Sequence, residues 1–300
     1  MLRTATSPNE LLTEEFPPAC VSETRPFPPE IVAAPLICEA TISPKRLRSS
    51  SVPFTLLTFT APLLLVILQL PAALVSSILP KAFTSFGAVE ATRIGGSATI
   101  KDSNGAVHVT EAQGFVSANS SFGAVKVNQL SKGANIVTGN GSIELSNVQG
   151  EVYAKTSFGS IYAENVKGKF TAQDSNGSVT AKSVEGDASV STSFSGVSLE
   201  GIGGKIMVEN QNGAVDVTAS GASCKDVSIR TSFSHIGVRL PANAGYRIKA
   251  RTSFGRINSQ LPITATGAMG GDSLEGTIGN GGCALDLTNS NGNIDISRAP

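Results

Sequence analysis

The chain has 300 residues, 23 basic and 23 acidic side chains, two His and no Trp. Zero net charge gives no electrostatic basis for binding nucleic acid. With only two His, catalysis or metal binding by histidine is not expected. A content of 5% aromatic residues with 31 Gly is not typical of a large globular core. These numbers favour thin apolar layers joined by frequent turns, and we expect no cofactor.

Prolines dominate the N-terminal segment, residues 1–51, which contains eight of them. Each proline fixes φ and removes a backbone hydrogen-bond donor, so regular elements cannot run far between them. We therefore predict that residues 1–51 are disordered.

The next stretch, residues 51–80, carries no charged side chain. It is long enough to cross a hydrocarbon core, which needs about 20 residues, and Lys45, Arg46 and Arg48 precede it, which favours an inside N-terminus. We predict that residues 52–80 are a membrane anchor, as a signal-anchor or uncleaved signal, with the remainder extracytoplasmic. Three alternatives stay open: a buried segment that caps the first coil, a cleaved signal after an extension, and a first residue that is not the native start.

A repeat with a period of 18 residues begins near residue 84. Its marker is the glycine that ends each Ser-Phe-Gly or Ser-Asn-Gly triplet. This position is occupied by Gly87, Gly105, Gly123, Gly141, Gly159, Gly177, Ser195 and Gly213, and then at wider spacing by Ser234, Gly255 and Gly292. A fixed period predicts one stacked array rather than separate domains.

Each repeat contains two short alternating runs. Apolar residues lie two and four positions after the triplet glycine, as in Val125 and Val127, and again at seven; a second run has them at eleven and thirteen, as in Val152 and Ala154. Such alternation is typical of strands with one buried face. The glycine usually found nine positions on requires either a positive φ or close backbone approach.

The fold predicted for residues 81–300 is all-β: a single-stranded β-solenoid, or β-helix, of about 18 residues per coil. No 3.6-residue period persists after residue 80, so helices are not expected there. A meander of hairpins is the competing fold, but it would not hold one register over so many repeats.

The residue before the triplet glycine alternates between Phe and Asn. The series consists of Phe86, Phe122, Phe158, Phe194, Phe233 and Phe254, with Asn104, Asn140, Asn176 and Asn212, and Asn291 at the close. In stacked coils the Phe would recur every second layer, about 9.6 Å apart, and each would contribute about 1.5–3 kcal/mol if fully buried. We interpret the series as a structural corner ladder; the alternative is a ligand-binding aromatic stripe.

The four cysteines, Cys20, Cys38, Cys224 and Cys283, show neither a CxxC motif nor zinc-like spacing. If the coils stack in sequence order, Cys224 and Cys283 lie about three coils apart, or ~14 Å. A disulfide needs Cα atoms within about 7 Å, so both are expected to be reduced.

Acidic side chains show no catalytic or metal-binding arrangement in the sequence. The acids expected to point outward, Asp102, Glu144, Glu164, Glu200 and Asp216, are scattered among Ser, Thr and Lys, whereas glycoside hydrolysis needs a convergent pair. The DSNG turns lack the Asp spacing of calcium-binding nonapeptide repeats. We therefore predict no catalytic, cofactor-binding or metal-binding residues.

The repeat pattern resembles a known family. The alternating TSFG and DSNG units (residues 156–159 and 174–177), RTSFGRI at 251–257 and LTNSNGNIDI at 287–296 are similar to the adhesin-like β-strand-repeat family of bacterial envelope proteins (DUF4097-like). The resemblance covers residues 84–300. It implies a right-handed β-helical ectodomain on an exported or membrane-anchored protein, and the family offers no established catalytic residues.

The resulting hypothesis is a non-catalytic, envelope-anchored, adhesin-like rod that serves as a binding or structural surface. Residues 52–80 would contact the membrane, and the Ser/Thr/Asn faces would contact glycan, cell wall or another envelope protein. A self-assembling scaffold, with coils stacked end to end as in bactofilins, is the alternative. A carbohydrate-active enzyme is the third candidate.

Overall fold

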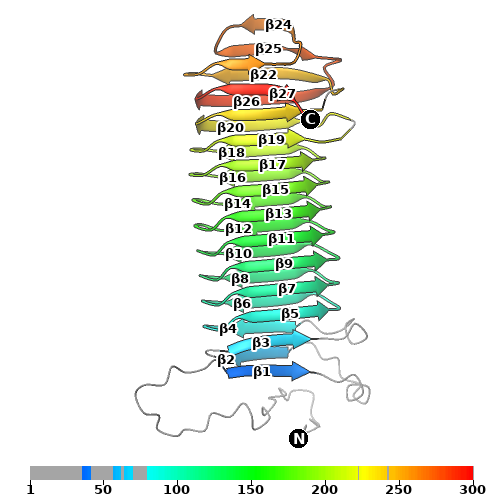
Figure 1. The fold of residues 1–300 in the computed structure, drawn as a ribbon, viewed down its shortest axis with the longest axis vertical. Coiled ribbons are helices and arrows are strands. Elements are labelled where there is room, and N and C mark those ends of the chain that lie inside the picture. The colour runs from blue at the N-terminus through cyan, green and yellow to red at the C-terminus, as the bar shows by residue number, and fades with distance from the viewer. Residues whose placement is uncertain are drawn as a thin grey trace, which may run out of the picture.

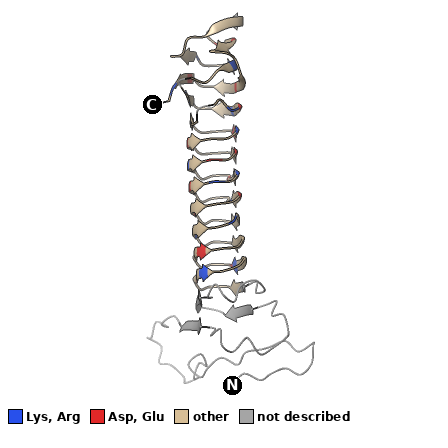
Figure 2. Cartoon of the chain, turned by 90° about the vertical axis from the view of Figure 1, so that its right-hand side faces the viewer, with Lys and Arg blue, Asp and Glu red and all other residues tan. Residues whose placement is uncertain are grey.

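The computed structural model describes residues 36–41, 57–61, 64–69, 80–221, 223–241 and 243–299. These residues form strands and turns only, so the predicted all-β solenoid is confirmed (Figure 1). Among them no helix occurs that is long and apolar enough to cross a membrane. Two sheets face each other along a thin rod, as the view in Figure 2 shows.

The first sheet has 13 strands, each from a different coil. In spatial order they are β1 (Leu36–Thr41), β3 (Leu64–Gln69), β5 (Val89–Ile94), β7 (Val107–Ala112), β9 (Val125–Leu130), β11 (Ile143–Val148), β13 (Ile161–Val166), β15 (Val179–Val184), β17 (Val197–Ile202), β19 (Val215–Ala219), β21 (Ile236–Leu240), β27 (Ile294–Arg298) and β23 (Ile257–Ser259).

The second sheet has 14 strands. In spatial order they are β2 (Leu57–Ala61), β4 (Pro80–Thr84), β6 (Ala98–Asp102), β8 (Val116–Ser120), β10 (Ala134–Thr138), β12 (Val152–Lys155), β14 (Phe170–Gln173), β16 (Ala188–Thr192), β18 (Ile206–Asn210), β20 (Val227–Phe233), β26 (Cys283–Asn291), β22 (Tyr246–Thr252), β25 (Ser273–Ile278) and β24 (Thr264–Met269).

Strands in the regular part pair in parallel with the residue 18 positions away, as in Ile143 with Ile161. Each coil therefore presents the same alternation to the interior, and the core is a continuous column of Val, Ile, Leu and Ala. The apolar positions two, four and seven after the triplet glycine are buried, as predicted; in β9 these are Val125, Val127 and Leu130.

Strict alternation would bury positions two, four and six after the triplet glycine, but the third buried side chain is at position seven. A residue in the left-handed conformation at position six explains the difference. Position six has a positive φ of 54–58° in successive coils although the residues are not glycine, and the series is Arg93, Glu111, Gln129, Asn147, Asn165 and Ser183, with Gly201 at 72°. This single left-handed residue interrupts the alternation and returns the next side chain to the core.

The glycines of the repeat are required for close backbone approach rather than for a positive φ. A Cβ on Gly159 would lie 2.0 Å from the carbonyl oxygen of Gly141 in the coil before it, and a Cβ on Gly114 would lie 2.2 Å from the carbonyl carbon of Gly96. Of the two explanations that the sequence left open for the glycine nine positions on, close approach is the one observed.

In the described part of the chain, β1, β2 and β3 precede β4, the first strand that pairs with the residue 18 positions away. Within the predicted disordered segment, β1 pairs with β3, and the other residues of 1–51 lie outside the described part of the chain. Within the predicted anchor, β2 pairs with β4 and β3 pairs with β5. This pairing is what the capping alternative requires, while the anchor itself stays a prediction.

At the other end, stacking in sequence order is wrong. β26 pairs with β20 on one side and β22 on the other, and β27 likewise lies between β21 and β23. The last coil of the chain is therefore inserted between the two coils that precede it in sequence. The array ends instead with β25, antiparallel to β22, and β24, antiparallel to β25.

Candidate binding edge

One long edge of the rod carries the Phe and Asn residues, and we call it the triplet edge. It is the row of corners that lead from the second sheet to the first. Because the last coil is inserted, Asn291 lies beside Phe233, and the next corner up is that of Phe254, whose N–H bonds to the Ser290 carbonyl at 2.9 Å. The two Phe that follow each other in sequence are thus separated in space by an Asn, and the alternation has no interruption from Phe86 to Phe254.

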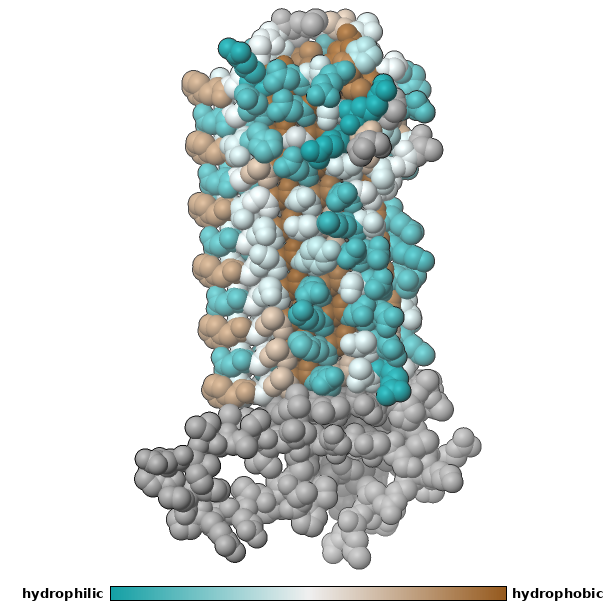
Figure 3. Space-filling model, in the orientation of Figure 1, coloured by the Kyte–Doolittle hydropathy of each residue, from teal (hydrophilic) through white to brown (hydrophobic). Residues whose placement is uncertain are grey.

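The Phe side chains do not pack across the turn. Their exposed fractions range from 53% at Phe233 to 79% at Phe254, so the burial that would let them stabilise the corner is not found. Figure 3 shows them along one edge as a column of brown side chains that alternate with teal ones. The geometry is that of an exposed aromatic stripe, the alternative left open by the sequence.

The Asn side chains lie back on the rod. Asn104 and Asn176 donate from Nδ2 to the main-chain carbonyls of Ser85 and Ser157, at 2.9 and 3.1 Å. The same bond joins Asn212 to Ser193 and Asn291 to Ser232, each at 3.4 Å. The amide therefore joins each of these coils to the coil below.

The triplet edge is uncharged over most of its length. From residue 85 to residue 214, the corner positions that flank the Phe or Asn are Ser, Ala, Gly or Gln. Charged side chains begin only near the C-terminal end of the edge, at His235 and Arg256. An apolar or polar uncharged partner therefore fits this edge better than a charged one.

A buried polar column under the triplet edge holds the corners in place. It consists of Thr84, Asp102, Ser120, Thr138, Thr156, Asp174, Thr192, Asn210, Thr231, Thr252 and Asn289. The Thr156 hydroxyl accepts from the Gly159 N–H at 3.2 Å and donates to the Gly141 carbonyl of the previous coil at 3.0 Å. Sequence reasoning missed this column, although a Thr, Ser, Asp or Asn three residues before the triplet glycine was its signal.

Two carboxyl groups belong to the column, which corrects the placement of Asp102 on the outer face. Asp102 and Asp174 are buried, at 5% and 7% exposure. Burial raises the pKa of both groups, opposed by backbone N–H donors such as that of Gly105. One carboxylate oxygen of each has no hydrogen-bond partner, because a carboxylate cannot donate to the preceding coil as threonine does.

Of the other acids expected to point outward, Glu144 and Glu200 are exposed and Glu164 and Asp216 are partly buried, and each has a local partner. Glu144 lies 2.7 Å from the Lys126 ammonium and Glu200 lies 3.8 Å from that of Lys182. Glu164 accepts from the Tyr162 hydroxyl at 2.9 Å, and Asp216 lies 3.6 Å from His235 Nε2. Among the described residues, no group of three His, Cys, Asp or Glu side chains could hold a metal ion.

The opposite edge is polar. Asn165 donates to Asn147 Oδ1 at 3.2 Å, and Asn147 donates to Asn128 Oδ1 at 3.0 Å. Two left-handed residues, Asn147 and Asn165, thus form a short amide ladder with Asn128, which precedes the left-handed Gln129. An open, shallow groove runs beside it, lined in part by Lys167 and Glu185. Both signs of charge are present, and no set of polar groups converges there.

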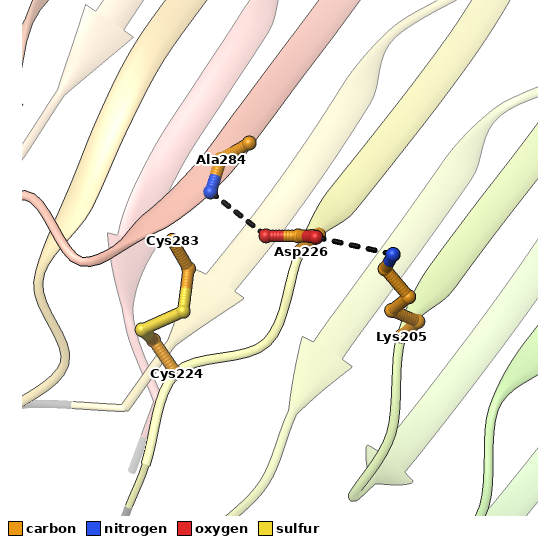
Figure 4. Close-up of a disulfide and its surroundings, with 5 residues drawn as sticks. All are labelled: Lys205, Cys224, Asp226, Cys283 and Ala284. Atoms are coloured by element: carbon orange, nitrogen blue, oxygen red, sulfur yellow. Dashed lines mark hydrogen bonds and ion pairs between the residues drawn. A yellow bond between two sulfur atoms is a disulfide. The ribbon is translucent and has the colours of Figure 1, made fainter.

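Cys224 and Cys283 form a disulfide, with Cα atoms 5.9 Å apart, which corrects the expected reduced state. The estimate of ~14 Å failed because the coil of Cys283 is inserted directly above that of Cys224. Beside the bridge, Asp226 accepts from the Ala284 N–H at 3.0 Å and lies 3.3 Å from Lys205 Nζ (Figure 4). The Ala284 N–H, followed by Lys205, lowers the pKa of Asp226.

Comparison with protein-family models, with curated proteins and with solved structures gave no match. The adhesin-like resemblance therefore stays a prediction.

Proposed function

We propose that this chain is a non-catalytic, exported, adhesin-like rod that binds its partner through the triplet edge. The observation that carries the proposal is the column of six Phe side chains, all more than half exposed, on an edge that is uncharged over most of its length. Monomeric soluble proteins seldom expose apolar patches beyond about 300–600 Å², and larger patches mark interaction sites.

Export is supported by the disulfide between Cys224 and Cys283. Structural disulfides persist in oxidising compartments and are rare in the cytosol. Residues 52–80 supply the anchor in this proposal because they are apolar and follow basic residues. The argument for export rests on the disulfide and does not depend on the anchor.

End-to-end assembly, the second candidate, is disfavoured at the C-terminal end of the rod. The last strand of the second sheet, β24, is antiparallel and has a register shift between Ala265 and Met269. The last strand of the first sheet, β23, is only three residues long. Short or irregular edge strands are devices that prevent further strand pairing. A carbohydrate-active enzyme is the weakest candidate because the acids Glu144, Glu164, Glu200 and Asp216 each have a local partner and do not form a convergent pair.

The proposal is tested with the full chain and isolated cell-wall sacculi, envelope membranes and a glycan array as probes. We expect binding to at least one probe, and we expect the combined change Phe122→Ser, Phe158→Ser and Phe194→Ser to reduce it by tenfold or more. The matched control changes Phe115 and Met207, which are exposed apolar residues away from the triplet edge. Equal loss in both variants, or none in either, would exclude the triplet edge as the binding surface.

A further inference from the structure

We propose that the partner of the triplet edge is a second copy of this chain, bound antiparallel so that the Phe rings of the two rods interdigitate. The inference rests on the proposed function in one respect, the use of this edge for binding. It adds the identity and the geometry of the partner.

The spacing of the rings is self-complementary. Phe occupies every second coil and Asn every other, so successive rings are about 9.6 Å apart along the rod. A ring from a partner placed level with the Asn would lie about 4.8 Å along the rod from the ring above and from the ring below. Aromatic pairs prefer centroid separations of about 4.5–7 Å, so each gap fits one ring.

Each gap between two Phe rings holds one Asn side chain and small neighbours. The Asn donates to the coil below, as at Asn104 and Asn176, which fixes the direction of its amide. Its neighbours are small: Ser103 and Ala106 flank Asn104, and Ser175 and Ser178 flank Asn176. No charged group over residues 85–214 of the edge would repel an identical edge.

The available area is close to that of a stable dimer. Six rings, each about three-fifths exposed, present on the order of 700 Å² at about 200 Å² per ring. Specific interfaces bury about 800 Å² per partner. The flanking Ser and Ala side chains would supply the remainder.

Symmetry selects the orientation. A two-fold axis perpendicular to the rod and midway between two coils maps every Phe coil onto an Asn coil, and it closes the pair as an isologous dimer. The axis would pass beside Asn176, the middle of the eleven corners. A two-fold axis along the rod would instead set Phe against Phe. If the rods are anchored at their N-terminal ends, antiparallel pairing would join two facing surfaces.

Self-association of the full chain is measured by sedimentation over a wide concentration range. We expect a reversible dimer, and we expect the combined Phe122→Ser, Phe158→Ser and Phe194→Ser variant to raise the dimer Kd about a thousandfold. The Phe115→Ser, Met207→Ser variant should dimerise as the parent does. Circular dichroism and thermal melting of each variant report whether the rod is intact.

Orientation is measured by cross-linking in a Cys20→Ser, Cys38→Ser background. Ser85→Cys and Ser253→Cys chains, mixed and treated with a short bis-maleimide, should give a heterodimer, because antiparallel pairing brings the two ends within about one coil, or ~5 Å along the rod. Ser85→Cys chains alone should give none.

A monomer at every concentration would overturn the inference, as would a dimer that the triple variant leaves unchanged or a Ser85→Cys cross-link to itself. The proposed function fails separately, when the parent and the triple variant bind the envelope probes equally. A monomeric parent that binds sacculi through the triplet edge would overturn the second-copy partner alone.

Discussion

The regular coils from residue 84 to 217 and the C-terminal end from residue 220 to 299 obey the same register but differ in the order of stacking. In the regular coils, each strand rests on the strand 18 residues earlier. At the C-terminal end, the strand β26 of the last coil pairs with β20 on one side and with β22 on the other, so the last coil lies between two coils that precede it in sequence. The inward and outward alternation of side chains fixes which face is buried and leaves open which coil lies next to which.

The two regions also differ in how adjacent coils are held together. Regular coils are joined by backbone ladders and by the buried polar column, with glycines that allow the backbones to meet. The inserted coil has these features and in addition a disulfide and the Asp226 carboxylate. The inserted coil is thus held to its neighbour by a covalent bond as well as by backbone pairing.

The largest effect is expected from a side chain added where backbones meet. Gly159→Ala would place a Cβ 2.0 Å from the Gly141 oxygen, and we expect a loss of about 4 kcal/mol or more of unfolding free energy. Gly271→Ala, whose Cβ would meet nothing within 4 Å, should change it by less than about 0.5 kcal/mol. Urea unfolding measures both, and equal losses would contradict the role assigned to Gly159.

Removal of the disulfide should have the next largest effect and should be confined to the C-terminal end. The bridge joins residues 59 apart in sequence, and its loss through Cys224→Ala with Cys283→Ala should cost about 2–4 kcal/mol. Hydrogen exchange should accelerate in β26, β27 and β22 and stay unchanged in β9 to β13. Uniform acceleration over the rod would show that the inserted coil is not a separate weak region.

A smaller gain is expected from repair of the polar column. One carboxylate oxygen of Asp174 has no hydrogen-bond partner, and the previous coil has a threonine, Thr156, at the same position of the column. Asp174→Thr should therefore stabilise the rod by about 1 kcal/mol at neutral pH. The folded-state pKa of Asp174 is raised. Between about pH 4 and that raised value, the folded parent binds more protons than the unfolded chain, so the parent loses stability as pH rises.

The advantage of Asp174→Thr should therefore shrink toward pH 4. Unfolding curves at pH 4 and pH 7 give the two differences, and exposed Glu151→Thr serves as the matched control. A gain that stays constant with pH would show that the carboxyl group is not responsible.

The smallest effect is expected on the outer face of the regular coils. Lys126 and Glu144 form an exposed pair at 2.7 Å between adjacent coils, and exposed pairs contribute about 0–1 kcal/mol. Lys126→Gln should shift the unfolding free energy by less than about 0.5 kcal/mol. A loss above about 1 kcal/mol would show that cross-coil charges stabilise the array.

Most of the solenoid could be predicted because each 18-residue repeat shows the same local alternation of apolar and polar residues. The buried positions of β9, Val125, Val127 and Leu130, follow from alternation alone. The left-handed position six could not be predicted in the same way, because Arg93 and Glu111 carry no preference for a positive φ there. That conformation is imposed by the stacking of coils.

The position of the triplet edge could be predicted from the sequence. The exposure of its Phe side chains and the unbroken alternation of Phe and Asn along it could not. The corner places of Phe158 and Asn176 follow from the period, whereas exposure depends on how the corner projects from two packed sheets. One signal of the insertion was present: Phe233 and Phe254 succeed each other without an Asn, and Asn291 follows late. The cysteine pair is a second signal, but its spacing indicates a disulfide only if the coils do not stack in sequence order.

Disulfide mapping of the native full chain is the most direct test of the inserted coil, on which the unbroken Phe and Asn alternation depends. Digestion without reduction, followed by mass spectrometry, should give a cross-linked peptide that contains Cys224 and Cys283. Coils stacked in sequence order would hold these residues about 14 Å apart, beyond the reach of a disulfide. Free thiols at both positions in oxidised, folded protein would contradict the inserted coil.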